Sequence, residues 1–171
     1  MSVSMYQSSI PVFVRFLNNL SEILSQAEKF AESKKIDESV LVNARLAPDM
    51  YPLSRQIQIA SDAVKGCTAR LAGLELPSFP DTETTFAELQ ARIQKTKDFV
   101  QSVTPEQIDG SEIRPITLKV GGHELSFEGR SYLSNFVLPN FFFHISMTYA
   151  ILRHNGVDLG KKTYLGDPIA A

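Results

Sequence analysis

The sequence predicts an all-α protein, a four-helix up-and-down bundle that carries a small β-hairpin before its last helix. Four segments repeat apolar residues every three or four positions, as amphipathic helices do, and one later segment changes to a two-residue period. The chain has 171 residues, of which 43% are hydrophobic and 21% charged, so it can bury a core without cross-links. We therefore expect a single domain over residues 1–171.

The first helix is expected to begin after Ser4 and to end near Lys34. Ser4 and Gln7 have the spacing of a capping box, and an apolar stripe follows them along the segment. Pro11 lies inside this pattern and removes a backbone donor, so the helix either starts later or kinks, and we favour a kink. A short helical turn capped by Asp37 is expected next.

Two further helices are expected over residues 51–71 and 85–103. Gly73 ends the earlier of these helices, because glycine readily adopts the left-handed conformation that follows a helix. The later helix begins at a second capping-box spacing, formed by Thr85 and Glu88. Two prolines in the segment between the helices predict a loop there.

A β-hairpin is expected at about residues 114–128, because apolar and polar residues alternate on both sides of Gly121-Gly122. The last helix is expected to begin around Arg130 or after Pro139. Residues 157–171 show no periodic pattern, and we expect an irregular tail there.

Charge and hydropathy narrow the classes of partner. The 17 basic and 19 acidic residues give a formal net charge of −2, which argues against nucleic acid as a partner and against an anionic membrane surface. No run of about 18 apolar residues and no leader-like first segment are present, so we expect no membrane partner and a cytoplasmic location. The single cysteine, Cys67, lies on an apolar stripe and is expected to act as a small hydrophobic residue.

The strongest chemical candidate is the polar pair Asn140 and His144, which shares one face of the last helix with Met147 and Ile151. Two polar side chains on an apolar stripe either satisfy each other or line a cavity. In the functional interpretation they lie at the floor of a pocket, where an imidazole binds a metal or moves a proton near neutral pH. In the structural interpretation the histidine is hydrogen-bonded to a polar partner in the core.

The second long helix offers partners for this pair. Asp49 and Gln56 lie seven residues apart and project near the apolar stripe, whereas Gln58 and Asp62 point toward the opposite side. Either Asp49 and Gln56 face His144 across the bundle, or Asp49 caps a helix and Gln56 is a partly exposed amide. With Asn140, Asp49 and Gln56 are the candidate substrate-binding residues, and His144 is the candidate catalytic residue.

Four stretches of the chain carry a family resemblance: Leu46-Ala-Pro-Asp-Met-Tyr-Pro-Leu53, Arg70-Leu-Ala-Gly73, Leu138-Pro-Asn-Phe-Phe-Phe-His144 and Ile151-Leu-Arg-His-Asn-Gly156. With them the sequence resembles an uncharacterised bacterial and fungal family grouped with the DinB/YfiT-like metalloenzymes. The likeness spans nearly the whole chain. It implies a DinB-like bundle that forms a homodimer, for which the edge of the first helix around Val12 and Phe16 would be a suitable interface.

The resemblance also implies a metal site. DinB-like proteins typically bind a divalent metal through one histidine on the second helix and a histidine pair four apart on the last helix. Asn140 and His144 fall on the paired positions, and the remaining position falls on Gln56 by the apolar period or on Gln58 by a gap-free match. Amide oxygens are weaker ligands than imidazole for zinc or nickel, so the implied site for zinc, nickel or manganese is degenerate.

Two functions remain open from the sequence. In the first, the chain is a metal-dependent transferase or hydrolase acting on a small molecule, with His144 as metal ligand or general base and with Asn140 and Gln56 orienting water or substrate. In the second, the metal is lost and the chain is a non-catalytic bundle that binds a small ligand or serves as a structural dimer.

Overall fold

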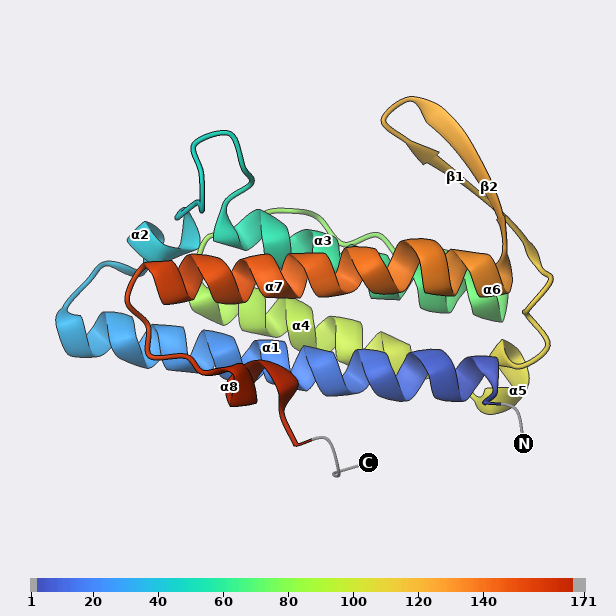
Figure 1. The fold of residues 1–171 in the computed structure, drawn as a ribbon, viewed down its shortest axis with the longest axis horizontal. Helices are drawn as coiled ribbons and strands as arrows, with labels where there is room; N and C mark the ends of the chain where they lie inside the picture. The colour runs from blue at the N-terminus through green and yellow to red at the C-terminus, as the bar shows by residue number, and fades with distance from the viewer. Residues whose placement is uncertain (1–2, 168–171) are drawn as a thin grey trace.

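The computed structural model describes residues 3–167 and is predominantly helical, with one two-stranded antiparallel hairpin (Figure 1). The long helices, which pack against one another, are α1 (Met5–Lys34), α3 (Leu53–Ala72), α4 (Phe86–Gln101) and α7 (Leu138–His154). The short helical segments are α2 (Glu38–Val42), α5 (Pro105–Ile108), α6 (Gly129–Ser131), the π-helix η1 (Tyr132–Val137) and α8 (Lys161–Leu165). The strands are β1 (Pro115–Val120) and β2 (His123–Glu128).

Local capping explains where several helices begin, as the sequence predicted. The Ser4 hydroxyl accepts the backbone N–H of Gln7, and the Gln7 side chain accepts the backbone N–H of Ser4. Thr85 and Glu88 form the same reciprocal pair at the start of α4. Helix α1 continues through Pro11. The expected short helix is α2, and the Asp37 carboxylate caps it by accepting the backbone N–H of Ser39.

The expected up-and-down alternation is wrong for the middle pair of long helices, because α3 and α4 run in the same direction. The first turns of α3 lie beside the start of α4, where Gln58 donates to Glu83. Further along both helices, the hydroxyls of Ser61 and Thr96 lie 2.6 Å apart. Helices α1 and α4 instead run antiparallel, and the ribbon shows the same directions (Figure 1).

The connection between α3 and α4 makes this parallel arrangement possible. Residues 73–85 contain no helix or strand and run back along the bundle (Figure 1). An extended chain covers about 3.3 Å per residue and a helix about 1.5 Å, so this segment is long enough to return along α3. The periodic pattern of the helices gives no information on direction, which is why the expected order failed here.

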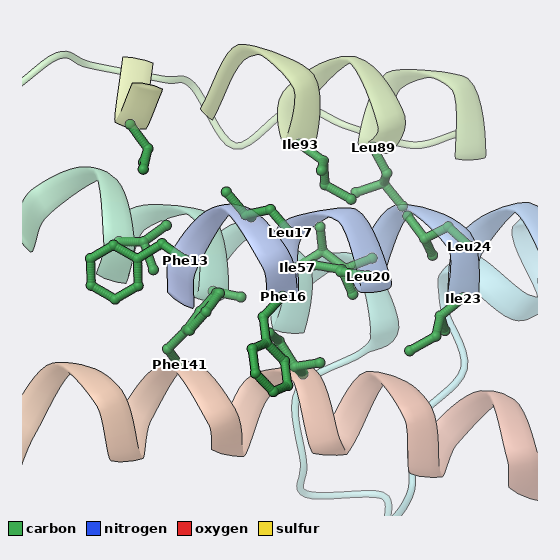
Figure 2. Packing of buried hydrophobic residues seen from close by; sticks show 14 of the residues in the cluster. Phe13, Phe16, Leu17, Leu20, Ile23, Leu24, Ile57, Leu89, Ile93 and Phe141 are labelled. Carbon is green, nitrogen blue, oxygen red and sulfur yellow. The ribbon is translucent and has the colours of Figure 1, made fainter. Parts of the chain in front are cut away.

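The core lies between the four long helices and is built largely from apolar side chains. Figure 2 shows the α1 residues Phe13, Phe16 and Leu17 directed toward the neighbouring helices, with Phe141 of α7 packed beside the two rings. The rings of Phe13 and Phe141 meet edge to face, with centroids 5.7 Å apart, which is a favourable geometry for aromatic pairs. Cys67 is fully buried, and burial raises the pKa of its thiol, consistent with the expected structural use.

The hairpin is confirmed with the expected turn. Ile116 pairs with Phe127 and Leu118 with Leu125, so these apolar side chains share one face of the ribbon. Gly121 and Gly122 have φ values of 57° and 84°, and two positive φ values are what a type I′ turn requires. The hairpin projects from the same side of the bundle as the loop between α2 and α3 (Figure 1).

Of the two expected starting points of the last helix, the structure supports the one around Arg130, because Pro139 lies inside continuous helix. The chain is helical from Gly129 through α6, η1 and α7, and Pro139 lies in the first turn of α7. Proline has no backbone N–H and its ring crowds the carbonyl four residues earlier, so the turn before it widens into the π-helix η1, in which Leu138 donates to the carbonyl of Leu133.

The expectation of an irregular tail over residues 157–171 is wrong for one segment, because residues 161–165 form α8. This helix lies along α1, where the ring of Tyr164 contacts Phe16 and Asn19 donates to the carbonyl of Tyr164. Five residues are too few to show helical periodicity in the sequence, and these contacts stabilise the turn. Residues 168–171 lie outside the described part of the chain.

Candidate functional site

His144 and Gln56 face each other across the interface between α7 and α3. These helices run antiparallel, and the contact joins His144 Nδ1 to Gln56 Oε1 at 2.7 Å. Both side chains are buried, with 7% of His144 and 2% of Gln56 exposed. A buried polar pair of this kind requires mutual satisfaction, and the hydrogen bond provides it.

The direction of this hydrogen bond follows from a second one. Gln56 Nε2 donates to the backbone carbonyl of Tyr51 at 3.0 Å, which fixes the amide so that Oε1 faces the imidazole. An amide oxygen can only accept, so Nδ1 of His144 must carry the proton. The other ring nitrogen, Nε2, therefore holds a lone pair and is a hydrogen-bond acceptor.

His144 is neutral at physiological pH. Burial disfavours the imidazolium and the positive charge of Arg55 adds to this effect, which together lower the pKa to about 4. Within residues 3–167 no side chain forms a hydrogen bond with Nε2. The fully buried side-chain atoms without a hydrogen-bond partner are Arg15 Nε, Arg92 Nε and Ser111 Oγ, and Nε2 is not one of them. Nε2 is therefore partly accessible to solvent.

Two exposed aromatic residues adjoin this pair: Phe143 precedes His144 in the chain, and the backbone of Tyr51 holds Gln56. Phe143 is 51% exposed, and its ring lies edge to face with the imidazole at a centroid distance of 5.2 Å. Tyr51 is 57% exposed, and the guanidinium of Arg55 lies 5.9 Å from the centre of its ring. Arg55 is also paired with Asp81. Two exposed aromatic side chains and one cation thus flank the segments that carry His144 and Gln56.

Asn140 does not pair with His144. It lies one turn earlier on α7 and is half-buried, and among the described residues no hydrogen bond joins it to the imidazole. Thr148, one turn later, donates to the backbone carbonyl of His144 at 3.0 Å. The amide of Asn140 remains available on the same face of the helix as His144.

Of the two glutamines considered on the second long helix, only Gln56 reaches His144. Gln56 contacts His144, whereas Gln58 donates to Glu83 and accepts from Arg55 on the side of α3 that faces α4. Asp49 is exposed in the loop between α2 and α3, and no hydrogen bond joins it to Gln56 or His144 in the described residues. It does not cap α3 either, since the N-cap residue is Pro52.

The donor set does not fit a tightly held divalent metal. In the described part of the chain no group of three or more His, Cys, Asp and Glu side chains is placed so that it could hold a metal ion. Gln56 Oε1 already accepts a hydrogen bond from His144. The side-chain groups left to bind a metal are therefore one imidazole nitrogen and the amide of Asn140. Stable zinc sites use at least three protein ligands, and harder ions prefer carboxylates.

Three features of the site were missed from the sequence. The carbonyl of Tyr51 orients Gln56, Arg55 acts on His144 through its charge, and Phe143 covers the imidazole edge. Backbone carbonyls carry no signal in a sequence. Phe143 directly precedes His144 in the sequence, and this adjacency was the one available signal.

The fold and the site together define a DinB-like helical bundle with a buried, neutral histidine between its second and last long helices. Residues 5–165 match the family described as "Domain of unknown function (DUF1993)", and the chain belongs to this family.

A solved structure supports the same class. The chain is 40% identical to a DinB family member protein from Shewanella denitrificans, with a TM-score of 0.86, and the alignment covers 97% of this chain and 94% of that one. The comparison with curated proteins finds no match. The DinB-like resemblance is therefore confirmed. No helix within residues 3–167 is long and apolar enough to cross a bilayer.

Proposed function

We propose that this protein is a non-catalytic small-molecule-binding bundle in which His144 Nε2 accepts a hydrogen bond from the ligand. The observation that carries the proposal is the chain of hydrogen bonds from His144 through Gln56 to the Tyr51 carbonyl, which fixes the imidazole as an acceptor. The ligand is a neutral molecule with one N–H or O–H donor beside an apolar group that packs on Phe143 and Tyr51.

The low pKa favours binding over general-base catalysis. A general base works best when its pKa lies near the operating pH, and a pKa of about 4 leaves His144 a weak base at pH 7. The same low pKa keeps the imidazole uncharged, so it accepts a hydrogen bond at all physiological pH values. Charged amines are disfavoured as ligands because Arg55 is close by.

The metal-dependent transferase or hydrolase is the second candidate function. The free Nε2 and the membership of a DinB-like class favour it, since Nε2 is the atom of His144 that a metal would use. The donor set described above argues against zinc, nickel or manganese as a resident cofactor. A homodimer and a cytoplasmic location, both expected from the sequence, also remain proposals.

Phenol and anisole provide a matched pair of probes, because they differ in whether the oxygen can donate. Protein labelled with 15N in its histidines is titrated with each, and the His144 Nε2 resonance is followed at pH 7. We expect saturable shifts with phenol alone, since only phenol can donate to Nε2. Equal responses to both probes, or none, would contradict the proposal.

Metal titrations distinguish the two candidates. Protein without a histidine tag is titrated with zinc, nickel and manganese, and bound metal is measured by elemental analysis in the wild type and in His144→Ala. We expect substoichiometric metal in both proteins. One equivalent in the wild type that is lost in His144→Ala would replace the proposal with the metal-dependent enzyme.

A further inference from the structure

A second candidate site lies on the face of α3 that the returning connection covers. A cavity of about 340 Å³ opens there between the second half of α3 and the start of residues 73–85. Its lining includes Asp62, Lys65, Gly66, Arg70, Ser78 and Phe79. Neither His144 nor Gln56 takes part, so the cavity is independent of the site above.

Lys65 is a buried cation with donor capacity to spare. Its side chain is 7% exposed, and Nζ lies 2.7 Å from Asp62 Oδ1 and 4.4 Å from the centre of the Phe79 ring. An ammonium group has three N–H donors, and Asp62 takes one of them. A further acceptor in the cavity would therefore find a donor that is already desolvated.

Arg70 is a cation without a carboxylate partner among the described residues. Its Nη1 donates a hydrogen bond to the hydroxyl of Tyr132, at 3.2 Å. Gly66 lets the guanidinium lie against the helix, because a Cβ there would come within 2.5 Å of Nη1. The remaining N–H groups of Arg70 form a planar fork suited to an oxyanion.

The one acidic residue of the lining does not cancel this charge. Asp62 is shared between Lys65 at 2.7 Å and Arg92 at 3.0 Å, so two cations already neutralise it. Arg92 is in turn paired with Asp81 and Glu83, which lie near the end of the connection, just before α4. The local excess of positive charge therefore remains at Arg70, next to the cavity.

We propose that this cavity binds a small oxyanion, either free phosphate or the phosphate group of a small molecule, between Lys65 and Arg70. The exposed residue Ser78 adds a hydroxyl donor at the wall formed by the connection. Phosphate offers several acceptor oxygens, which match one ammonium, one guanidinium and one hydroxyl. Bound anion would also tie residues 76–79 to α3.

The test changes Ser78, because it lies in the exposed connection and its replacement spares the helix core. Ser78→Asp places a carboxylate beside Lys65 and Arg70, and Ser78→Asn is the neutral control of the same shape. Binding of inorganic phosphate and of phenyl phosphate is measured by calorimetry at low ionic strength. We expect Ser78→Asp to weaken binding by at least about tenfold through charge repulsion, and Ser78→Asn by less than about twofold.

One control and one second test variant make the outcome decisive. Ser33→Asp adds the same charge at the end of α1, away from the cavity, and is expected to bind phosphate like the wild type. Arg70→Gln keeps a donor for Tyr132 but loses the charge, and is expected to weaken binding as Ser78→Asp does, with circular dichroism verifying its fold. Absence of saturable binding to the wild type, or equal binding by Ser78→Asp and Ser78→Asn, would overturn the proposal.

Discussion

At the scale of single residues, the central feature is that one amide sets the chemistry of one imidazole. Gln56 is held by the carbonyl of Tyr51 and in turn holds Nδ1 of His144, so the tautomer is decided outside the ring. Burial and Arg55 then keep the ring uncharged. A histidine in this state is a hydrogen-bond acceptor that solvent can reach.

This arrangement predicts a pH-dependent contribution of His144 to stability. Its pKa is about 4 in the folded state and about 6.5 when unfolded, so between these values the unfolded chain binds more protons. The stabilisation is present above pH 6.5 and is lost as the pH falls toward 4. Relative to His144→Gln, which does not titrate, the wild type should lose about 2 kcal/mol of unfolding free energy between pH 7 and pH 5.

Urea denaturation of both proteins at several pH values measures this difference. His123 and His154 are exposed and present in both proteins, so the comparison isolates His144. A difference between the two proteins that does not change from pH 7 to pH 5 would show that His144 keeps an ordinary pKa.

Helical spacing was enough to select His144, Asn140 and Gln56, since residues four or seven apart share a face. It could not select the pairing, because Gln56 and Gln58 are both amides on one helix and only the three-dimensional contact separates them. It also placed Asp49 in the candidate set, although that residue lies in an exposed loop. Loop geometry has no period from which to read orientation.

At the scale of elements, the connection between α3 and α4 decides the order of the bundle. Its residues Asp81 and Glu83 pair with Arg92 of α4, and Arg92 also reaches Asp62 of α3. The ring of Phe79 contacts both Lys65 and Lys95, whose ammonium groups lie 4.4 and 4.2 Å from its centre. These contacts fix the returning segment against two parallel helices.

Removing the central cation should therefore destabilise the fold. The Arg92 side chain is only 1% exposed, and Arg92→Met would leave three carboxylates together without their shared partner. We expect a loss of about 3 kcal/mol in unfolding free energy, and a smaller loss for Arg92→Lys, which keeps the charge. Chemical denaturation measures both. Equal losses for the two variants would mean that packing of the side chain matters and its charge does not.

The boundaries of elements were predictable wherever a local signal marks them. Two capping boxes, a glycine pair at the hairpin turn and a proline in the last helix each left such a signal. The direction of α4 and the existence of α8 left none, because both depend on contacts between residues far apart in the chain. Helix α8, for example, depends on Phe16 and Asn19 of α1.

At the scale of the whole molecule, the proposed homodimer is open to direct measurement. Val12 and Phe16 mark the edge of α1 that the sequence suggested as an interface, but Phe16 is buried under Tyr164 of α8. Val12 is only partly buried and lines a groove with Ile10, Pro11 and Val14. If a dimer uses this groove, Val12→Glu should shift the sedimentation coefficient from dimer to monomer. A dimer unaffected by Val12→Glu would place the interface elsewhere.

The measurement that tests the central claim most directly is a long-range 1H–15N spectrum of the histidine rings, recorded from pH 8 to pH 4. For His144 we predict a protonated Nδ1 and an unprotonated Nε2 through physiological pH, with protonation of Nε2 beginning only as the pH approaches 4. Protonation near pH 6.5, or a proton on Nε2 in the neutral ring, would contradict the account.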